Sequence, residues 1–201
     1  MAQESIMSRK TNRPEWHEDA LAAVNCLKRG GILLHATDTV WGLGCDATNF
    51  AAVEKLFKFK NREDQKTMIC LVSDFKMLNY HVEEIPEAAY SILEHAADPT
   101  TIVYDKPLRV TENLIAADNT LAIRMVKEGF CADLLKRFKK PIVSTSANIS
   151  GKPTPKTFQE IEAYILKGVD YVVNLERTKK ASKPSSIIKL SNNGEVKVIR
   201  K

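Results

Sequence analysis

Short apolar segments alternate with amphipathic segments along nearly the whole chain, and this alternation limits the fold more than any other feature. Apolar residues recur at helical spacing from Trp16 until Gly30 and Gly31, where a helix should end. A short apolar run at residues 32–35 follows, as expected of a buried strand. Helix-like and strand-like segments then alternate up to the last residues, which is typical of α/β proteins with a mixed sheet.

Helical spacing and short apolar runs also predict where the remaining helices and strands lie. Further helices are expected from about residue 49, after residue 74 with Asp74 as N-cap, and at residues 88–93, 130–138 and 158–165. Further strands are expected at residues 68–72, 101–104, 121–125, 141–143, 171–175, 186–190 and 196–199. A hairpin signal, Asn192-Asn193-Gly194, joins the last two strands and implies some antiparallel pairing.

The length fits one domain with a short arm, since 201 residues exceed the usual domain size of about 150 only modestly. Residues 1–14 are polar and aperiodic, so we expect a flexible basic N-terminal arm followed by a single domain over residues 15–201. The arm could touch RNA, but a solvated tail is the favoured interpretation. Residues 178–186 are the best candidate for a mobile loop.

Composition narrows the class of protein. Apolar residues make up 44% and charged residues 27%, an ordinary globular mixture, and the net charge of +5 suits an anionic partner without naming one. No apolar run approaches the roughly 20 residues that span a bilayer, and no signal peptide is recognisable. The cysteines are too scattered for a structural zinc site, so we expect free thiols and a cytoplasmic protein: Cys26, Cys45, Cys70 and Cys131.

One apparent cofactor motif does not fit its context. Residues 42–47 match GxGxxA, and Glu63 and Asp64 lie about 20 residues beyond, as in a dinucleotide-binding fingerprint. That fingerprint must begin at the end of a strand and open a helix, whereas here a polar turn separates it from the preceding strand. We therefore interpret Gly42 and Gly44 as glycines that allow close backbone packing.

A basic run at the end of the second predicted helix is more informative. Lys58, Lys60, Arg62 and Lys66 fall within nine residues. On an extended segment Lys60 and Arg62 would lie side by side and could hold a polyphosphate. A solvated helix end is an equal alternative, because cations favour the C-terminal end of the helix dipole.

Polar residues also occur where buried strands are expected. The hydroxyls and amide of residues 144–148 follow an apolar strand, where α/β sheets bind ligands, although a turn that satisfies its own backbone is the favoured interpretation of the pattern. Arg124 lies inside an apolar strand, so it requires either a carboxylate partner or an anionic ligand. His35, beside another apolar strand, is interpreted as a core residue.

Together these segments resemble the YrdC-type threonylcarbamoyl-AMP synthase family. That family carries a PTET-like strand end, VYGLG, KxR, an AxRxP-like strand and SxN. This chain has ATDTVWGLG at residues 36–44, KNR at 60–62, LAIRM at 121–125 and STSANISGKP at 144–153. The match in order and spacing extends from about Trp16 to Arg200. The resemblance implies a twisted mixed β-sheet flanked by helices, with an open concave ligand cleft.

The resemblance also implies an activity. An L-threonylcarbamoyladenylate synthase is a nucleotidyltransferase that forms threonylcarbamoyl-AMP and pyrophosphate from L-threonine, bicarbonate or CO2, and ATP. ATP is then a substrate and is accompanied by Mg²⁺. A downstream tRNA threonylcarbamoyl-transferase complex uses the product to modify the adenosine next to the anticodon of tRNA.

Site residues follow from the resemblance position by position. Lys60 and Arg62 would act as the catalytic cations. The implied ATP-binding residues are Lys60, Arg62, Lys66, Thr120, Ser146, Asn148, Thr154 and Arg200. The implied threonine-binding residues are Thr39, Arg124, Ser144 and Ser185. No metal-ligating residue is implied.

The sequence departs from the family pattern at a few positions, which keep alternatives open. Ala36 replaces Pro, Asp38 replaces Glu, Trp41 replaces Tyr or Phe, and Leu71 stands where some relatives have a His. Asp38 also occurs in the YciO-like branch, which tends to lack the SAN segment that is intact here. The alternatives are a YciO-like protein, an RNA-binding or ribosome-maturation protein without threonine-dependent adenylation, and an adenylating enzyme for another substrate.

Overall fold

The structure is a computed structural model that describes residues 15–61, 68–175, 177–178 and 180–201. The predicted arm, residues 1–14, lies outside the described residues, so the domain boundary stays a prediction. Helices are α1 (His17–Lys28), α2 (Phe50–Phe59), α3 (Phe75–His81), α4 (Glu87–His95), η1 (Glu112–Leu114), α5 (Gly129–Phe138), η2 (Phe158–Glu160) and α6 (Ala163–Gly168). Strands are β1 (Leu33–Ala36), β2 (Trp41–Asp46), β3 (Ile69–Val72), β4 (Thr100–Asp105), β5 (Thr120–Met125), β6 (Ile142–Ser146), β7 (Tyr171–Val172), β8 (Ser186–Leu190) and β9 (Val196–Arg200).

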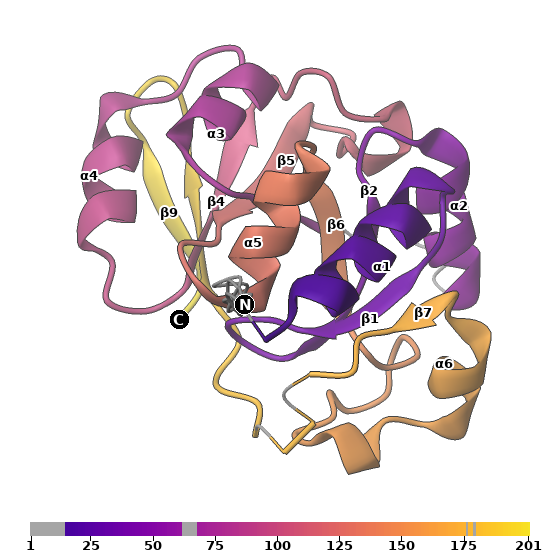
Figure 1. The fold of residues 1–201 in the computed structure, drawn as a ribbon. Coiled ribbons are helices and arrows are strands. Elements are labelled where there is room, and N and C mark those ends of the chain that lie inside the picture. Colours follow the sequence, from indigo (N-terminus) through magenta and orange to yellow (C-terminus); the bar gives the residue numbers. More distant parts are fainter. Residues whose placement is uncertain (1–14, 62–67, 176, 179) are drawn as a thin grey trace, which may run out of the picture.

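Within the described residues these strands form one mixed sheet in the order β7-β1-β2-β6-β3-β5-β4-β8-β9. The central pairs β2–β6 and β6–β3 are antiparallel, whereas β3–β5 is parallel. The hairpin β8–β9 is antiparallel, and Gly194 in its turn has φ +87°. The predicted α/β class with a twisted mixed sheet flanked by helices is confirmed (Figure 1).

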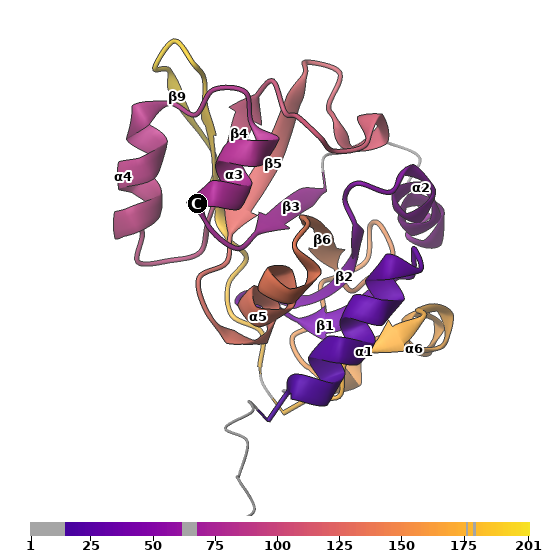
Figure 2. The same ribbon diagram turned by 45° about the horizontal axis from the view of Figure 1, so that its top comes forward.

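Helices α1 and α5 lie side by side across one face of the sheet in both views (Figures 1 and 2). They bury an apolar cluster that includes Val24, Leu27, Phe130 and Leu134. A second cluster joins buried residues of α2, α3 and α4 to strand residues such as Ile123. The two clusters follow from strand alternation, since neighbouring strand residues point to opposite faces of a sheet.

Side-chain caps fix the starts of two predicted helices. The Asn49 side chain accepts a hydrogen bond from the Ala52 amide at 3.1 Å, and Asp74 accepts one from Met77 at 2.8 Å. Both predicted starts are confirmed. The four cysteines are free and buried, as expected. Among the described helices, none combines the length and apolarity that crossing a bilayer requires.

Several element predictions are wrong in detail, and the strand expected at residues 171–175 already ends at Val172. Residues 158–165 form η2 and α6 rather than one helix, because Ile161 and Glu162 take extended backbone angles between them. Residues 41–46, interpreted only as a glycine-bearing segment after a turn, form the interior strand β2. The apolar strand predicted at residues 141–143 continues through its hydroxyl-bearing residues as β6, because these residues pair with β2 and β3.

The glycines of β2 have the role expected of them. They lie inside a strand, which excludes the strand-to-helix turn of a dinucleotide fingerprint. A Cβ added to Gly44 would lie 3.0 Å from the Val143 carbonyl oxygen and 3.2 Å from His35 Nε2. A Cβ added to Gly42 would lie 3.2 Å from Ser144 Oγ. Larger residues would therefore push β2 away from its neighbours.

We predict that Gly44→Ala lowers the free energy of unfolding by about 1–3 kcal/mol, because the methyl group overpacks the sheet. Urea denaturation monitored by circular dichroism measures the change. Gly194→Ala is the matched control, since a Cβ there meets nothing within 4 Å and only the backbone at φ +87° resists it. A smaller loss for Gly44→Ala than for Gly194→Ala would contradict the packing argument.

Candidate functional site

Arg124 is a buried cation near the end of β5, with 4% of its surface exposed. Its Nη2 donates to Asp38 Oδ1 at 2.8 Å, while its Nε lies buried without a hydrogen-bond partner. Both alternatives of the sequence analysis therefore stay relevant. A carboxylate partner is present, and the guanidinium retains a donor that an anionic ligand group could use.

Asp38 belongs to a tight turn between β1 and β2 that also carries Thr39. The Thr37 and Thr39 hydroxyls lie 3.0 Å apart, and Thr37 Oγ1 donates to the Val40 carbonyl at 2.7 Å. Thr39 is buried within this network. The Ser182 hydroxyl donates to the Asp38 and Thr39 carbonyls at 3.1 Å, so a segment from the end of the chain covers the turn.

Ser185, which immediately precedes β8, and Arg200, the last residue of β9, lie against each other near the same region. The buried Ser185 hydroxyl lies 2.8 Å from Thr101 Oγ1 of β4. Arg200 donates through Nε and Nη2 to the Ser185 carbonyl at 2.9 and 2.7 Å. Burial and the nearby positive charge of Arg124 lower the pKa of Arg200. Arg200 thus adds a second positive charge that acts on the surroundings of Arg124.

A cavity of about 1030 Å³ opens beside these groups. Asp38, Ser182 and Arg200 line it, together with residues of the segments 96–100 and 125–128. Its volume is at the upper end of the range for pockets that hold small ligands. Three predicted threonine-side residues, Thr39, Arg124 and Ser185, do not themselves line this cavity, but each is next in sequence to a residue that does: Asp38, Met125 and Ser186.

Lys60 lies at the other end of the site, at the C-cap of α2. It is only 2% exposed, and its Nζ donates to the Ser146 carbonyl at 2.6 Å. The solvated-helix-end alternative is therefore wrong for Lys60, and so is the extended segment, because Lys60 is helical and Asn61 has φ +51°. Lys58 is the solvated member, paired with Glu54 at 3.1 Å. Arg62 and Lys66 lie outside the described residues.

Ser144 and Ser146 connect the two ends of the site along β6. Ser144 is buried and lies opposite Gly44, and Ser146 lies opposite Gly42 at the start of β2. The space above Gly42 is bounded by Ser144 Oγ and by the Thr37 methyl group. The missing side chain of Gly42 thus lets hydroxyl-bearing residues of β6 and of the Asp38 turn approach one another.

The Asn148 side chain is hydrogen-bonded within the protein through its nitrogen but not through its oxygen. Its amide nitrogen donates to the Ile149 and Lys152 carbonyls at 3.0 and 2.6 Å, which is the self-satisfied turn considered in the sequence analysis. Its Oδ1 is buried without a partner. A buried oxygen that lacks a donor is costly, so a ligand donor there would be stabilising.

Two predicted residues are not joined to this set. Thr120 begins β5, roughly 13 Å along the strand from Arg124, and its hydroxyl donates to Asp118 at 2.7 Å. Thr154 is exposed in the segment after β6. Sequence reasoning did not assign Asp38, Thr101 or Ser182 to the site. Their contacts with Arg124, Ser185 and the Asp38 turn join positions far apart in sequence, which no local pattern signals.

His35 and Leu71 fill the interior beside the site. His35 is fully buried, as expected of a core residue, and burial lowers its pKa to about 4. Leu71 lies opposite Arg124 in the register of β3 and β5 and is fully buried with α5. Among the described residues, no group of three or more His, Cys, Asp or Glu is placed to hold a metal ion.

The sequence matches the family model Sua5_yciO_yrdC, described as "Telomere recombination", over residues 25–201. The chain belongs to the Sua5/YciO/YrdC family. Within this family, a threonylcarbamoyl-AMP synthase of Idiomarina loihiensis is 30% identical over 178 residues, which are 87% of this chain and 95% of that protein. A putative threonylcarbamoyl-AMP synthase of Methanocaldococcus jannaschii is 34% identical over 164 residues, or 82% and 76% of the two chains.

Solved Sua5/YciO/YrdC structures are similar as well. P. abyssi Sua5 complexed with L-threonine matches with a TM-score of 0.78 and 26% identity over 89% of this chain. This chain corresponds to 52% of that longer protein. E. coli YciO, at 21% identity, shares the fold with a TM-score of 0.80. The resemblance found in the sequence is therefore confirmed at the level of family and fold.

We predict that His35 makes the protein less stable in mild acid. The unfolded state binds a proton near pH 6.5 and the folded state only near pH 4, so stability is full above pH 6.5 and falls as the pH drops toward 4. The loss at pH 5 is about 2 kcal/mol. Urea titrations of wild type and His35→Gln at pH 7 and 5 measure it.

The variant should lose most of this difference. His81, whose pKa burial also lowers, and the charge of Arg124 beside His35 are present in both proteins. His95→Gln, at an exposed position, is the control and should behave as wild type. Equal acid sensitivity in His35→Gln and wild type would show that His35 is not the responsible group.

Proposed function

We propose that this chain is an L-threonylcarbamoyladenylate synthase, which forms threonylcarbamoyl-AMP and pyrophosphate from L-threonine, bicarbonate or CO2, and ATP. The observation that carries the proposal is the buried Arg124, which is hydrogen-bonded to Asp38 in the lining of a large cavity. A buried guanidinium with an unpartnered Nε is suited to the carboxylate of an amino acid. The names of the two relatives and the threonine complex of P. abyssi Sua5 support this assignment.

The proposed reaction requires positioning rather than a protein nucleophile. Threonine and CO2 first give a carbamate on the amino nitrogen. A carbamate oxygen then attacks the α-phosphorus of ATP, a new P–O bond forms, and the bond to the pyrophosphate leaving group breaks. Such a transfer is accelerated chiefly by holding the reactants in line and by neutralising the phosphate charge.

The site residues then divide into two groups. On the threonine side, Arg124 would bind the carboxylate, with Thr39, Ser144 and Ser185 around the substrate. The Asp38 carboxylate, 2.8 Å from Arg124, would share the guanidinium with threonine or yield to it. Cover by the Ser182 segment would keep water from the reactive mixed anhydride.

On the nucleotide side, Lys60 and Arg62 would stabilise the transferred phosphate. The remaining proposed nucleotide contacts are Lys66, Thr120, Ser146, Asn148, Thr154 and Arg200. Of these, Asn148 has the most specific structural support. Its buried Oδ1 lacks a hydrogen-bond donor, and a ribose hydroxyl could supply one. Mg²⁺ would arrive with ATP, held by phosphate oxygens.

The proposed product indicates which enzyme would act next and in which compartment. A threonylcarbamoyl adenylate would be consumed by a tRNA threonylcarbamoyl-transferase complex, in the cytoplasm. The test is pyrophosphate release from ATP and Mg²⁺, with threonine or bicarbonate omitted in turn. Release that requires both is expected. Release indifferent to threonine would favour the YciO-like alternative or another substrate, and no release from folded protein would favour an RNA-binding role.

For Lys60→Met we predict a loss of about 100-fold in kcat/KM for ATP, because the variant keeps the length of the side chain but removes the charge. Steady-state pyrophosphate release measures it. Lys58→Met is the matched control two residues away, where the lysine is exposed and paired with Glu54. Equal activities of the two variants would remove Lys60 from the reaction.

Arg124→Ala tests the threonine side. We predict a rise of about 10-fold or more in the KM for threonine with little change in the KM for ATP, because a charged hydrogen bond to the carboxylate is lost. Asp38→Asn is the control, since it breaks the same ion pair but keeps the guanidinium. If both variants show the same loss of stability and no change in threonine KM, Arg124 is only a structural partner of Asp38.

A further inference from the structure

A second cavity, of about 690 Å³, lies away from the proposed active site. It lies between α3 and the C-terminal end of α5, and we call it the α3–α5 pocket. Thr48 follows β2 there, Ser73 follows β3, and Lys140 precedes β6. Lys60 and Ser146 lie at the opposite end of β6, so the α3–α5 pocket is separate from these two proposed nucleotide contacts.

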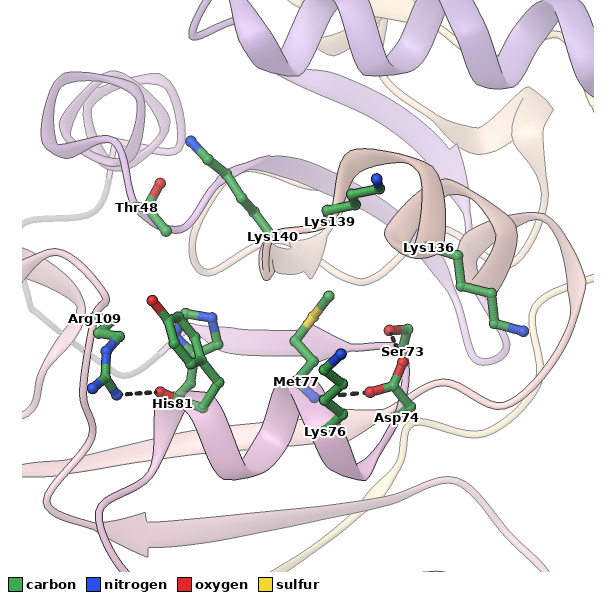
Figure 3. Close-up of a pocket in the computed structure, with 11 residues that line it drawn as sticks. Thr48, Ser73, Asp74, Lys76, Met77, His81, Arg109, Lys136, Lys139 and Lys140 are labelled. Carbon is green, nitrogen blue, oxygen red and sulfur yellow. Dashed lines mark hydrogen bonds between the residues drawn. The ribbon is translucent and has the colours of Figure 1, made fainter.

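The lining of the α3–α5 pocket is strongly cationic. Its positive residues come from two sides that face each other across the cavity in Figure 3, and they are Lys76, Arg109, Lys136, Lys139 and Lys140. Asp74 is the one acidic residue in the lining. Its carboxylate accepts hydrogen bonds from Ser73 Oγ and from the Met77 amide. The pocket thus carries a clear excess of positive charge.

Much of this charge is not used within the protein. Lys140 Nζ pairs with Asp46 at 2.8 Å, and Arg109 donates to the Tyr80 carbonyl at 2.7 Å. Across the described part of the chain, Lys76, Lys136 and Lys139 form no ion pair. Three ammonium groups without an ion pair, around a cavity whose lining has one carboxylate, favour an anionic ligand with several charged oxygens.

Two of the cations occupy backbone conformations that disfavour them. Arg109 has φ +55° and Lys139, at the C-cap of α5, has φ +62°. Glycine is the usual residue at such a left-handed helix end because it has no Cβ to clash. Any residue other than glycine costs free energy of folding at such a position. Among the described residues, Lys139 forms no ion pair that would offset this cost. A ligand would account for keeping the charge at this position.

The interior of the pocket adds a planar aromatic surface. Tyr80 is 58% exposed, and the Arg109 guanidinium carbon lies 4.3 Å from its ring centre. His81 packs edge-on against the same ring at 5.2 Å, and Met77 contributes an apolar surface. Stacked arginine and tyrosine planes are suited to a flat base. The volume also lies within the range for small-ligand pockets.

We propose that the α3–α5 pocket binds a free nucleotide, with the phosphates on Lys76, Lys136 and Lys139 and the base against Tyr80 and Arg109. This site is separate from the proposed ATP site of the reaction and does not rest on the proposed function. The ligand class is therefore a polyphosphate joined to an aromatic ring.

Calorimetric titration with ATP tests the proposal. Lys60→Met weakens binding at the proposed reaction site, so the variant isolates the second site. In this background we expect one ATP per chain to bind, and we expect the added pair Lys76→Ala/Lys139→Gly to weaken it at least 10-fold. Glycine at residue 139 suits the backbone there, so this variant should fold. Lys28→Ala/Lys167→Ala is the matched control on exposed lysines of α1 and α6, and it should bind as its parent does.

Further titrations distinguish a nucleotide from a polyphosphate or an RNA as the ligand. Tyr80→Ala should weaken ATP binding while leaving that of inorganic tripolyphosphate nearly unchanged. Unchanged ATP affinity in Lys76→Ala/Lys139→Gly would overturn the proposal. So would binding of a single-stranded oligonucleotide with no saturable binding of ATP, since the site would then be an RNA surface. Failure of the proposed function alone would abolish pyrophosphate release and leave these titrations intact.

Discussion

The buried guanidinium of Arg124 is the group on which the arrangement of the proposed active-site region depends. A cation inside a sheet loses its hydration, and one hydrogen-bonded carboxylate, Asp38, replaces only part of it. The turn that carries Asp38 must therefore stay in place. Its own threonine network and the Ser182 hydroxyl hold it from two sides. The same carboxylate that stabilises the fold competes with any acid that the site would bind.

The reaction side of the molecule is built for holding groups rather than for covalent chemistry. Burial raises the pKa of Cys70 and of Cys131 to about 12 and also raises the pKa of Cys45, so these thiols remain protonated. The proposed site instead carries hydroxyls and the cations Arg124 and Lys60. This distribution suits a transfer between two bound substrates, where geometry and charge supply most of the acceleration.

The sequence predicted the architecture well because local signals decide it. The Asn49 and Asp74 caps and most of the predicted helices and strands were correct, since each depends on neighbours within a few residues. Apart from the interrupted helix at residues 158–165, the failures in the site concern long-range pairing. The burial of Lys60 depends on a carbonyl 86 residues away, and the partner of Arg124 is equally distant. Helix-dipole reasoning could not foresee that a lysine at a helix end lies inside the protein.

The pairing of β4 with β8 has a consequence for how the chain folds. Thr100 lies opposite Ser186, and Arg200 of β9 binds the Ser185 carbonyl, so segments far apart along the chain meet in one corner of the sheet. Closing so long a loop is entropically expensive and slows folding. During synthesis on the ribosome, the early strands can collapse against α1 and α5 first. The pocket around Arg124 is completed only when residues 185–200 have emerged, so the nascent chain stays without a finished site until synthesis has passed this point.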